Sequence, residues 1–255
     1  MSMVTSSPLN NDEILLCERL RSMKLSGMAD AFATQMQDPN ADLRPFMERF
    51  TEIVNQEWQN RYDKKFNRFL KRAHLRYPDA NLDHTIYDPA RKLDATAIEQ
   101  LATCHWIDEG KNLLITGMTS SGKTYLSNAL CISALRQLKT VRYVRANTLM
   151  LELEQARLKA TYLDYVTALA RLDLLAIDDF GLMELDLDKC RDLFEVIDGR
   201  DGRRSTIIIS QFPIKSWFDL FKEHTYADAC LARITDKRHS YRLEMNGISM
   251  REAER

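Results

Sequence analysis

The segment from Gly117 to Thr124, Gly-Met-Thr-Ser-Ser-Gly-Lys-Thr, constrains this chain more than any other part of its sequence. It follows an apolar run and precedes a stretch with helical spacing. In a loop with this spacing, the glycines let successive backbone N–H groups turn toward phosphate oxygens, and the positive end of the following helix faces the same oxygens. The segment therefore predicts a phosphate-binding loop between a buried strand and a helix, with ATP as its ligand.

The side chains of this loop have predictable roles at a nucleotide. Lys123 would neutralise the β- and γ-phosphates, and the Thr124 hydroxyl would bind Mg²⁺, a cation that prefers oxygen ligands. The residues expected to bind the nucleotide are Gly117, Thr119, Ser120, Ser121, Gly122, Lys123, Thr124 and Tyr125. The sequence thus predicts ATP and Mg²⁺ as cofactors and an ATPase as the class of enzyme.

A second apolar run, from Leu172 to Asp179, ends in two carboxylates. P-loop NTPases hold their metal through an acidic residue at such a strand end, so Asp178 is predicted on the magnesium side. Asp179 could orient and deprotonate the attacking water, although many proteins of this class carry the longer glutamate there, and we therefore expect slow hydrolysis. Taken alone, such an acidic pair can also be a solvated turn.

A third apolar run, from Ser205 to Ser210, ends in polar residues. Ser210 is the candidate catalytic contact to the γ-phosphate and the attacking water, with Gln211 behind it. The alternative is that both residues only cap the strand and begin the turn to Pro213.

The distribution of apolar residues predicts the fold class. Apolar, β-rich runs at 112–116, 140–145, 172–178 and 205–210 are separated by segments of helix length, which predicts an α/β domain with a parallel sheet covered by helices. Residues before 76 instead have helical spacing, and prolines with Asn or Asp interrupt the pattern between 77 and 89. We therefore expect a small all-α N-terminal domain over residues 1–85 and an ATPase domain over residues 86–255.

Composition excludes several classes of protein. No apolar run approaches the roughly 20 residues that cross a bilayer, and the polar start of the chain is unlike a secretory signal, so we expect a cytoplasmic protein without a membrane partner. The 5 cysteines are scattered without a Cys-x-x-Cys pair, which predicts buried thiols in place of zinc ligands or disulfides. The net charge of −1 leaves room only for a local basic patch.

A basic segment precedes the expected domain boundary. Its members are Arg61, Lys64, Lys65, Arg68, Lys71, Arg72 and Arg76. Positions 61, 65, 68, 72 and 76 fall along one face of a helix, while Phe66, Phe69, Leu70 and Ala73 would pack inward. Such a face could neutralise several phosphates without reading sequence, and it could equally be a solvated helix surface.

Beyond these motifs, the chain resembles the AAA+ ATPases of the IstB/DnaC-like kind, and within them the IstB-type transposition helper proteins. The resemblance covers most of the chain. Besides the phosphate loop and the basic helix, it rests on Lys24-Leu-Ser-Gly-Met-Ala29, Asn112-Leu-Leu-Ile-Thr-Gly117, Ile177-Asp-Asp-Phe-Gly-Leu182, Ser210-Gln-Phe-Pro213, Ala229-Cys-Leu-Ala-Arg-Ile234 and Gly247-Ile-Ser-Met-Arg251. This ordered set is far more specific than the phosphate loop alone.

The resemblance implies further site residues. Arg233 would be the arginine finger that reaches the ATP of a neighbouring subunit, a role that suits a fixed guanidinium charge. Arg251 would contact the nucleotide of its own subunit, although Met250 replaces the aromatic residue that the family usually has before it. Arg157 and Lys159 would lie in an insertion that faces a central channel and contacts DNA, or in ordinary helices that cover the sheet.

The resemblance also implies the function and the partners. The expected protein is an ATP-dependent helper that oligomerises on duplex DNA and delivers or remodels target DNA for a transposase, with ATP hydrolysis that is slow and stimulated by DNA. The alternative is a helicase-loader adaptor whose N-terminal helices bind a replicative helicase.

Overall fold

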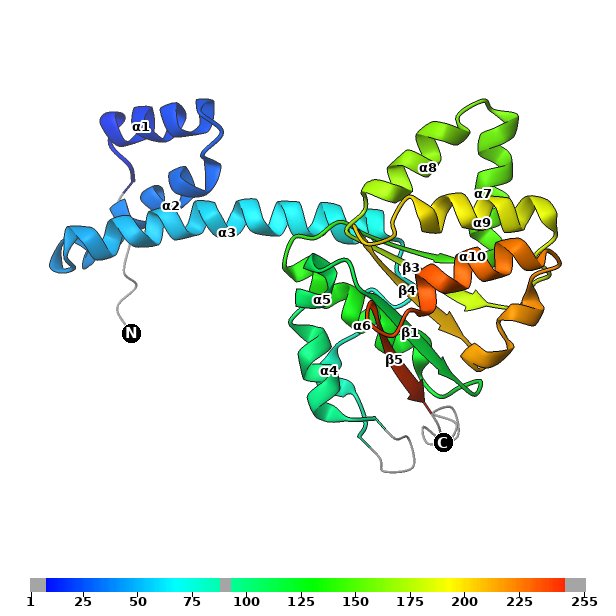
Figure 1. The fold of residues 1–255 in the computed structure, drawn as a ribbon. Helices are drawn as coiled ribbons and strands as arrows, with labels where there is room; N and C mark the ends of the chain where they lie inside the picture. The colour runs from blue at the N-terminus through cyan, green and yellow to red at the C-terminus, as the bar shows by residue number, and fades with distance from the viewer. Residues whose placement is uncertain (1–7, 88–92, 246–255) are drawn as a thin grey trace. The chain divides into compact units, whose positions relative to one another are not determined.

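The computed structural model describes residues 8–87 and 93–245 (Figure 1). These residues fall into two compact units, one that ends at Asn67 and one that begins at Arg68. This division lies earlier in the chain than the boundary predicted at residues 85 and 86. No helix in the described ranges is long and apolar enough to cross a membrane.

The earlier division has a local cause in the segment after the basic helix. The side chains of Leu75, Ala80 and Leu82 pack against Ala129 and Ile132 of α6, the helix that follows the phosphate loop. The segment therefore belongs by packing to the nucleotide-binding unit, although its polar composition looks like a linker.

The first unit consists of helices, as predicted. Its elements are α1 (Asn11–Ser22), α2 (Ser26–Met36), the short η1 (Ala41–Leu43) and the first part of α3 (Phe46–Ala73). Gly27 lets α2 approach α3 closely, because a Cβ at this position would lie 2.9 Å from the Cα of Glu57. At this approach the Gly27 N–H donates to Oε2 of Glu57 at 2.7 Å, which fixes α2 on α3.

The second unit contains a parallel sheet of five strands. In chain order they are β1 (Asn112–Gly117), β2 (Val141–Arg145), β3 (Leu174–Phe180), β4 (Ser205–Ser210) and β5 (Ser240–Met245), and their order across the sheet is β2-β3-β4-β1-β5. The four predicted strands are all present. β5 was not predicted because it is an edge strand with mixed polar and apolar residues, so it has no continuous apolar run.

Helices cover both faces of this sheet. They are α4 (Ala95–Ala102), α5 (His105–Asp108), α6 (Lys123–Arg136), α7 (Ala146–Leu158), α8 (Tyr162–Arg171), α9 (Leu187–Asp198) and α10 (His224–Thr235), with short turns η2 (Leu82–His84), η4 (Ile214–Ser216) and η5 (Phe218–Leu220). Right-handed crossovers place α6 on one face and α7 to α10 on the other (Figure 1).

The core lies between the sheet and these helices. Leu114, Ile177 and Ile208 point from three neighbouring strands into a cluster formed with α7, α8, α9 and α10. All five cysteines are buried free thiols, as predicted. Since the strands are parallel, their carboxyl ends meet at one edge of the sheet, where α/β proteins bind ligands.

Candidate nucleotide-binding site

The phosphate loop connects β1 to α6 in the predicted strand–loop–helix context. Its backbone has positive φ at Gly117 (146°), Ser120 (65°) and Gly122 (89°). A Cβ at Gly117 would lie 2.0 Å from the carbonyl oxygen of Met245, so the neighbouring strand β5 excludes any side chain there. Gly122 caps the N-terminus of α6 in the left-handed region, and the N-terminal N–H groups of that helix open onto the loop.

The side chain of Lys123 folds back onto the loop that precedes it. Its Nζ donates to the carbonyl oxygens of Gly117 (2.7 Å) and Met118 (2.6 Å). Burial lowers the pKa of Lys123, while the charges of Asp178 and Asp179 oppose this shift. An ammonium group held by two carbonyls in a partly dry site favours an anionic ligand, and phosphate oxygens would supply one.

Asp178 stands at the centre of a hydrogen-bond network at the end of β3. Its Oδ2 accepts hydrogen bonds from the Thr124 hydroxyl (2.8 Å) and the Tyr143 hydroxyl (2.6 Å), and its Oδ1 accepts one from the Asp179 N–H (2.7 Å). Because Thr124 gives its hydrogen to Asp178, the lone pairs of its oxygen remain available to a cation. The donor set therefore fits Mg²⁺, which binds few protein oxygens and completes its shell with phosphates and water.

Tyr143 is a site residue that sequence reasoning missed. It lies on β2 and is 6% exposed, so in the sequence it looks like any aromatic residue of a buried strand. Only the pairing of β2 with β3 brings its hydroxyl to Asp178. Burial and this hydrogen bond both raise the pKa of Tyr143, which therefore stays a hydrogen-bond donor over the whole physiological range.

Asp179 adopts an unusual backbone conformation beside the magnesium-side carboxylate. Its φ is 57°, and the register between β3 and β4 shifts between Ile177 and Phe180. Such irregularities re-aim side chains next to functional sites. Burial, and then the charge of Asp178, raise the pKa of Asp179, against the opposing effect of Arg145, whose Nε lies 3.8 Å from Oδ2. A carboxylate with a raised pKa suits a general base.

The geometry at the end of β4 favours Gln211 over Ser210 for a contact with the γ-phosphate. The Ser210 hydroxyl donates its only hydrogen to the carbonyl of Phe180 (2.7 Å) and accepts from the N–H of Phe212 (3.1 Å). It therefore cannot also donate to a phosphate. Gln211 instead accepts a hydrogen bond from the Thr119 hydroxyl of the phosphate loop at 2.7 Å, which places its amide beside the loop.

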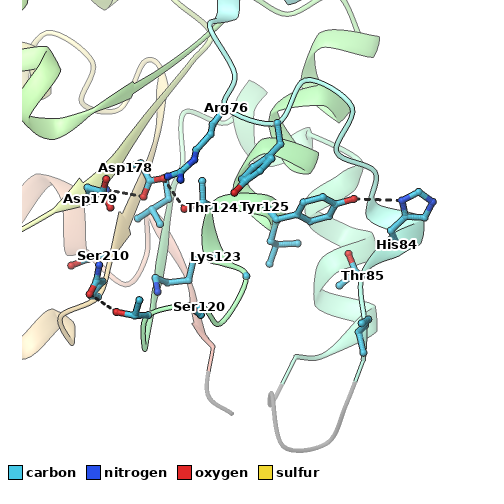
Figure 2. Close-up of a pocket in the computed structure, with 17 residues that line it drawn as sticks. Arg76, His84, Thr85, Ser120, Lys123, Thr124, Tyr125, Asp178, Asp179 and Ser210 are labelled. Atoms are coloured by element: carbon cyan, nitrogen blue, oxygen red, sulfur yellow. Dashed lines mark hydrogen bonds between the residues drawn. The ribbon is translucent and has the colours of Figure 1, made fainter. Parts of the chain in front are cut away.

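These groups surround one cavity of about 630 Å³ (Figure 2). This volume is in the range of small-molecule sites. The predicted residues that line it are Thr119, Ser120, Gly122, Lys123, Thr124, Tyr125, Asp178, Asp179 and Ser210. Gly117 instead pairs with β5, and the buried Ser121 hydroxyl lies 3.4 Å from the Lys123 ammonium.

Another part of the cavity wall comes from the segment 76–86, which the sequence did not assign to the nucleotide. The Tyr125 hydroxyl on α6 accepts a hydrogen bond from the Asn81 N–H (3.1 Å) and lies 3.5 Å from Nδ1 of His84. The Thr85 hydroxyl is buried in this wall and has no hydrogen-bond partner among the residues that the structure describes. A buried polar atom that lines a cavity is a candidate ligand contact.

Arg76 occupies a different place from the one predicted. α3 ends at Ala73, and His74 has a φ of 52°, so Arg76 lies beyond the helix and is not the last member of its basic face. It lines the nucleotide cavity instead. The other predicted DNA-contact residues on α3 are all exposed, namely Arg61, Lys64, Lys65, Arg68, Lys71 and Arg72.

The remaining predicted residues lie away from the cavity or outside the described residues. Arg233 on α10 forms an ion pair with Asp198 of α9 (2.7 Å) and lies over the ring of Phe194. A finger acts on a neighbouring subunit, so its role stays a prediction. Arg251, with the rest of its motif, lies outside the described ranges.

The second predicted DNA contact also stays a prediction. Arg157 near the end of α7 forms an ion pair with Asp192 and lies over the ring of Tyr162, at 4.0 Å from its centroid. These contacts engage the guanidinium within the protein. Lys159 follows the same helix and is exposed, so its ammonium is accessible to a partner.

Known sequences match this chain over most of its length. The model of a family described as IstB-like ATP binding protein matches residues 18–255. A protein of Sinorhizobium fredii named as an insertion sequence ATP-binding protein, y4uH, is 37% identical over 232 residues, which are 91% of this chain and 92% of that protein. The ATP-binding protein of insertion sequence IS1162 from Pseudomonas fluorescens is 37% identical over 195 residues, or 76% of this chain and 84% of that protein.

Solved structures share the fold of the second unit. The DnaC helicase loader matches 67% of this chain and 99% of its own length, with a TM-score of 0.56 and 18% identity. AMPPCP-bound DnaA from Aquifex aeolicus matches 68% of this chain and 51% of its own length, with a TM-score of 0.56 and 16% identity. At these identities the likeness establishes the AAA+ type of P-loop fold and nothing finer.

Proposed function

Because this chain belongs to the IstB-like ATP-binding protein family, we propose that it is the ATP-operated DNA-binding helper of an insertion sequence. In this role it binds ATP with Mg²⁺, assembles with copies of itself on duplex DNA, and delivers or remodels target DNA for a transposase. The names of its relatives, which place them in insertion sequences, support this assignment.

The observation that carries the nucleotide part is the convergence of Lys123, Thr124 and Asp178 on one cavity. Lys123 exchanges its two loop carbonyls for phosphate oxygens. Thr124 offers its oxygen to the metal while Asp178 fixes its hydroxyl hydrogen. When bound, Mg²⁺ supplies positive charge to the β- and γ-phosphates.

Hydrolysis in this proposal depends on the pair Asp179 and Gln211. Asp179 accepts a proton from the attacking water, and its side chain is shorter than the glutamate common at this position. Gln211, beside the phosphate loop, orients that water or the terminal phosphate by its amide. The shorter base favours slow turnover, which suits a switch that holds its ATP state until a partner is engaged.

DNA binding in this proposal uses the exposed cations of α3. Among them, Arg61 is held within the first unit, because its guanidinium donates to Oε1 of Glu57 (2.6 Å) and to the carbonyl of Lys24 (3.1 Å). Lys64 and Lys71 are exposed on the same helix. Exposed lysines and arginines on one helix neutralise phosphates and release counterions, so binding of this kind falls steeply with salt.

Assembly in this proposal uses Arg233 as the finger that senses ATP in the next subunit. Its guanidinium would leave Asp198 for the phosphate oxygens of that ATP. The exchange replaces one anion by another of higher charge, so it is favourable only when ATP is present. Nucleotide would thereby control the interface between subunits.

The decisive experiment is binding of the purified protein to random-sequence duplex DNA, with and without ATP, while particle size is followed by light scattering. We expect large particles that need both ATP and DNA. Lys123→Ala should remove the ATP response, and Arg233→Ala should keep ATP binding but lose the large particles. DNA binding by the wild type in neither state would refute the helper role and favour the helicase-loader alternative.

A charge-reversal variant tests the proposed DNA surface separately. Replacing Lys64 and Lys71 by Glu should weaken DNA binding and flatten its salt dependence by about one unit of slope per lost phosphate contact. The matched control is Lys215→Glu, an exposed lysine of η4, outside the basic segment. An unchanged slope in the α3 variant would remove this helix from the DNA interface.

A further inference from the structure

Arg76 is held in place on both sides by contacts with α6. On one side, Leu75 packs against the cluster of Ala129 and Ile132. On the other, the backbone N–H of Tyr77 donates to Oδ1 of the buried Asn128 at 3.1 Å. Because α6 begins at the phosphate loop, the backbone of Arg76 has a fixed position relative to the nucleotide site.

The side chain of Arg76 extends over the acidic end of the cavity. It lines the cavity together with Lys123, Asp178 and Asp179, and Figure 2 shows it reaching toward the two carboxylates. Its positive charge is one of those that lower the pKa of Asp179 against the dominant effect of burial. In the described part of the chain, however, no carboxylate lies within 4.0 Å of its guanidinium, which lies over the ring of Tyr77 at 5.6 Å from the ring centroid.

The position of Arg76 indicates which part of the nucleotide its guanidinium would contact. Thr124 and Asp178 would hold the metal, which would supply positive charge at the terminal phosphates, and Asp179 would face the attacking water. The end of the cavity that Arg76 faces is therefore the end of the terminal phosphate. A guanidinium offers several donors in a plane that matches phosphate oxygens.

We propose that Arg76 is a nucleotide-binding residue whose guanidinium contacts the terminal phosphate of ATP, in place of the DNA contact that its position in the basic segment suggested. The inference rests on the proposed Mg²⁺–ATP site. Arg76 follows the last residue of α3, Ala73, by three positions along the chain. The terminal phosphate would thus fix the residues that directly follow α3.

The test measures nucleotide affinity without DNA, using fluorescent ATP and ADP with Mg²⁺ and the full chain. Arg76→Ala should bind ATP about tenfold more weakly, which corresponds to about 1.4 kcal/mol. Its affinity for ADP should stay within about twofold, since ADP lacks the terminal phosphate. Arg203→Ala is the matched control, an exposed arginine of the same unit that does not line the cavity, and it should leave both affinities unchanged.

Three results would overturn the proposal. One is an unchanged ATP affinity in Arg76→Ala, and a second is an equal loss for ATP and ADP, which would place the guanidinium elsewhere on the nucleotide. The third is a wild type that binds no ATP, which would remove the site itself. DNA binding is measured separately, so a protein that binds ATP through Arg76 but fails to bind DNA would refute the helper role alone.

Discussion

Replacing Tyr143 by phenylalanine would remove one hydrogen bond from the carboxylate that holds Thr124. The bond is short (2.6 Å) and buried, and its acceptor is a carboxylate. Hydrogen bonds to charged groups contribute about 1.5–3 kcal/mol. Thr124 remains a second donor to the same oxygen, so we expect the free energy of unfolding to fall by an amount near the lower limit, about 1.5 kcal/mol.

Removing this hydrogen bond should also weaken the binding of Mg²⁺, which the metal dependence of ATP binding measures. Residues that orient a metal ligand from behind typically change metal affinity about 10–100-fold when they are replaced. For Tyr143→Phe we expect the Mg²⁺ concentration at half-saturation to rise about tenfold at the lower limit of that range. The assay is a Mg²⁺ titration of fluorescent ATP binding at fixed nucleotide and pH.

A second tyrosine, which is half-buried, provides the control. Tyr165 donates its hydroxyl to Oε2 of Glu152, between α8 and α7, and does not line the nucleotide cavity. Tyr165→Phe should therefore lower stability by a similar amount and leave the Mg²⁺ titration unchanged. An unchanged titration in Tyr143→Phe, or an equal shift in both variants, would refute the role of Tyr143 at the metal side.

Three further predictions concern separate parts of the second unit. Thr85→Val should weaken the binding of fluorescent ATP about fivefold, the value of one hydrogen bond near 1 kcal/mol, and an unchanged affinity would remove Thr85 from the ligand contacts. Because the pKa of Asp179 is raised, its base form appears only at higher pH than for an ordinary aspartate; the hydrolysis rate should rise with pH through that pKa, and Asp179→Asn should abolish this rise. Arg200→Met removes the buried donor to the carbonyls of Leu169, Leu172 and Ser205, and it should lower the free energy of unfolding in urea by about 3 kcal/mol or more. The control is Arg204→Met, which removes the more exposed ion pair with Asp173 and should lower it by less than about 1 kcal/mol.

The parts of the site that the sequence predicted are those encoded in short local patterns. The phosphate loop and the acidic strand end each combine a fixed spacing with an apolar run, and the parallel sheet then brings them together. Asp178 and Thr124 are hydrogen-bonded although 54 positions separate them. Their contact was predictable because the carboxyl ends of parallel strands meet at one edge of the sheet.

The parts that the sequence did not predict depend on long-range packing or on backbone irregularity. The helical spacing of α3 continues to Arg76, but the left-handed turn at His74 breaks it, and a non-glycine residue gave no sign of that turn. The choice between Ser210 and Gln211 depends on the carbonyl of Phe180, which accepts from Ser210 next to a register shift. Neither feature has a local sequence pattern.

The charge distribution allows one nearly neutral chain to bind two polyanions by different physical means. In the proposed DNA surface, lysines such as Lys64 and Lys71 are exposed, so their interaction with phosphates is screened by salt. At the nucleotide, Lys123 is only 7% exposed and acts together with backbone N–H groups inside a cavity, where screening is weak. Raising ionic strength should therefore release DNA while ATP stays bound, because the two ligands differ in how much water surrounds the cations that hold them.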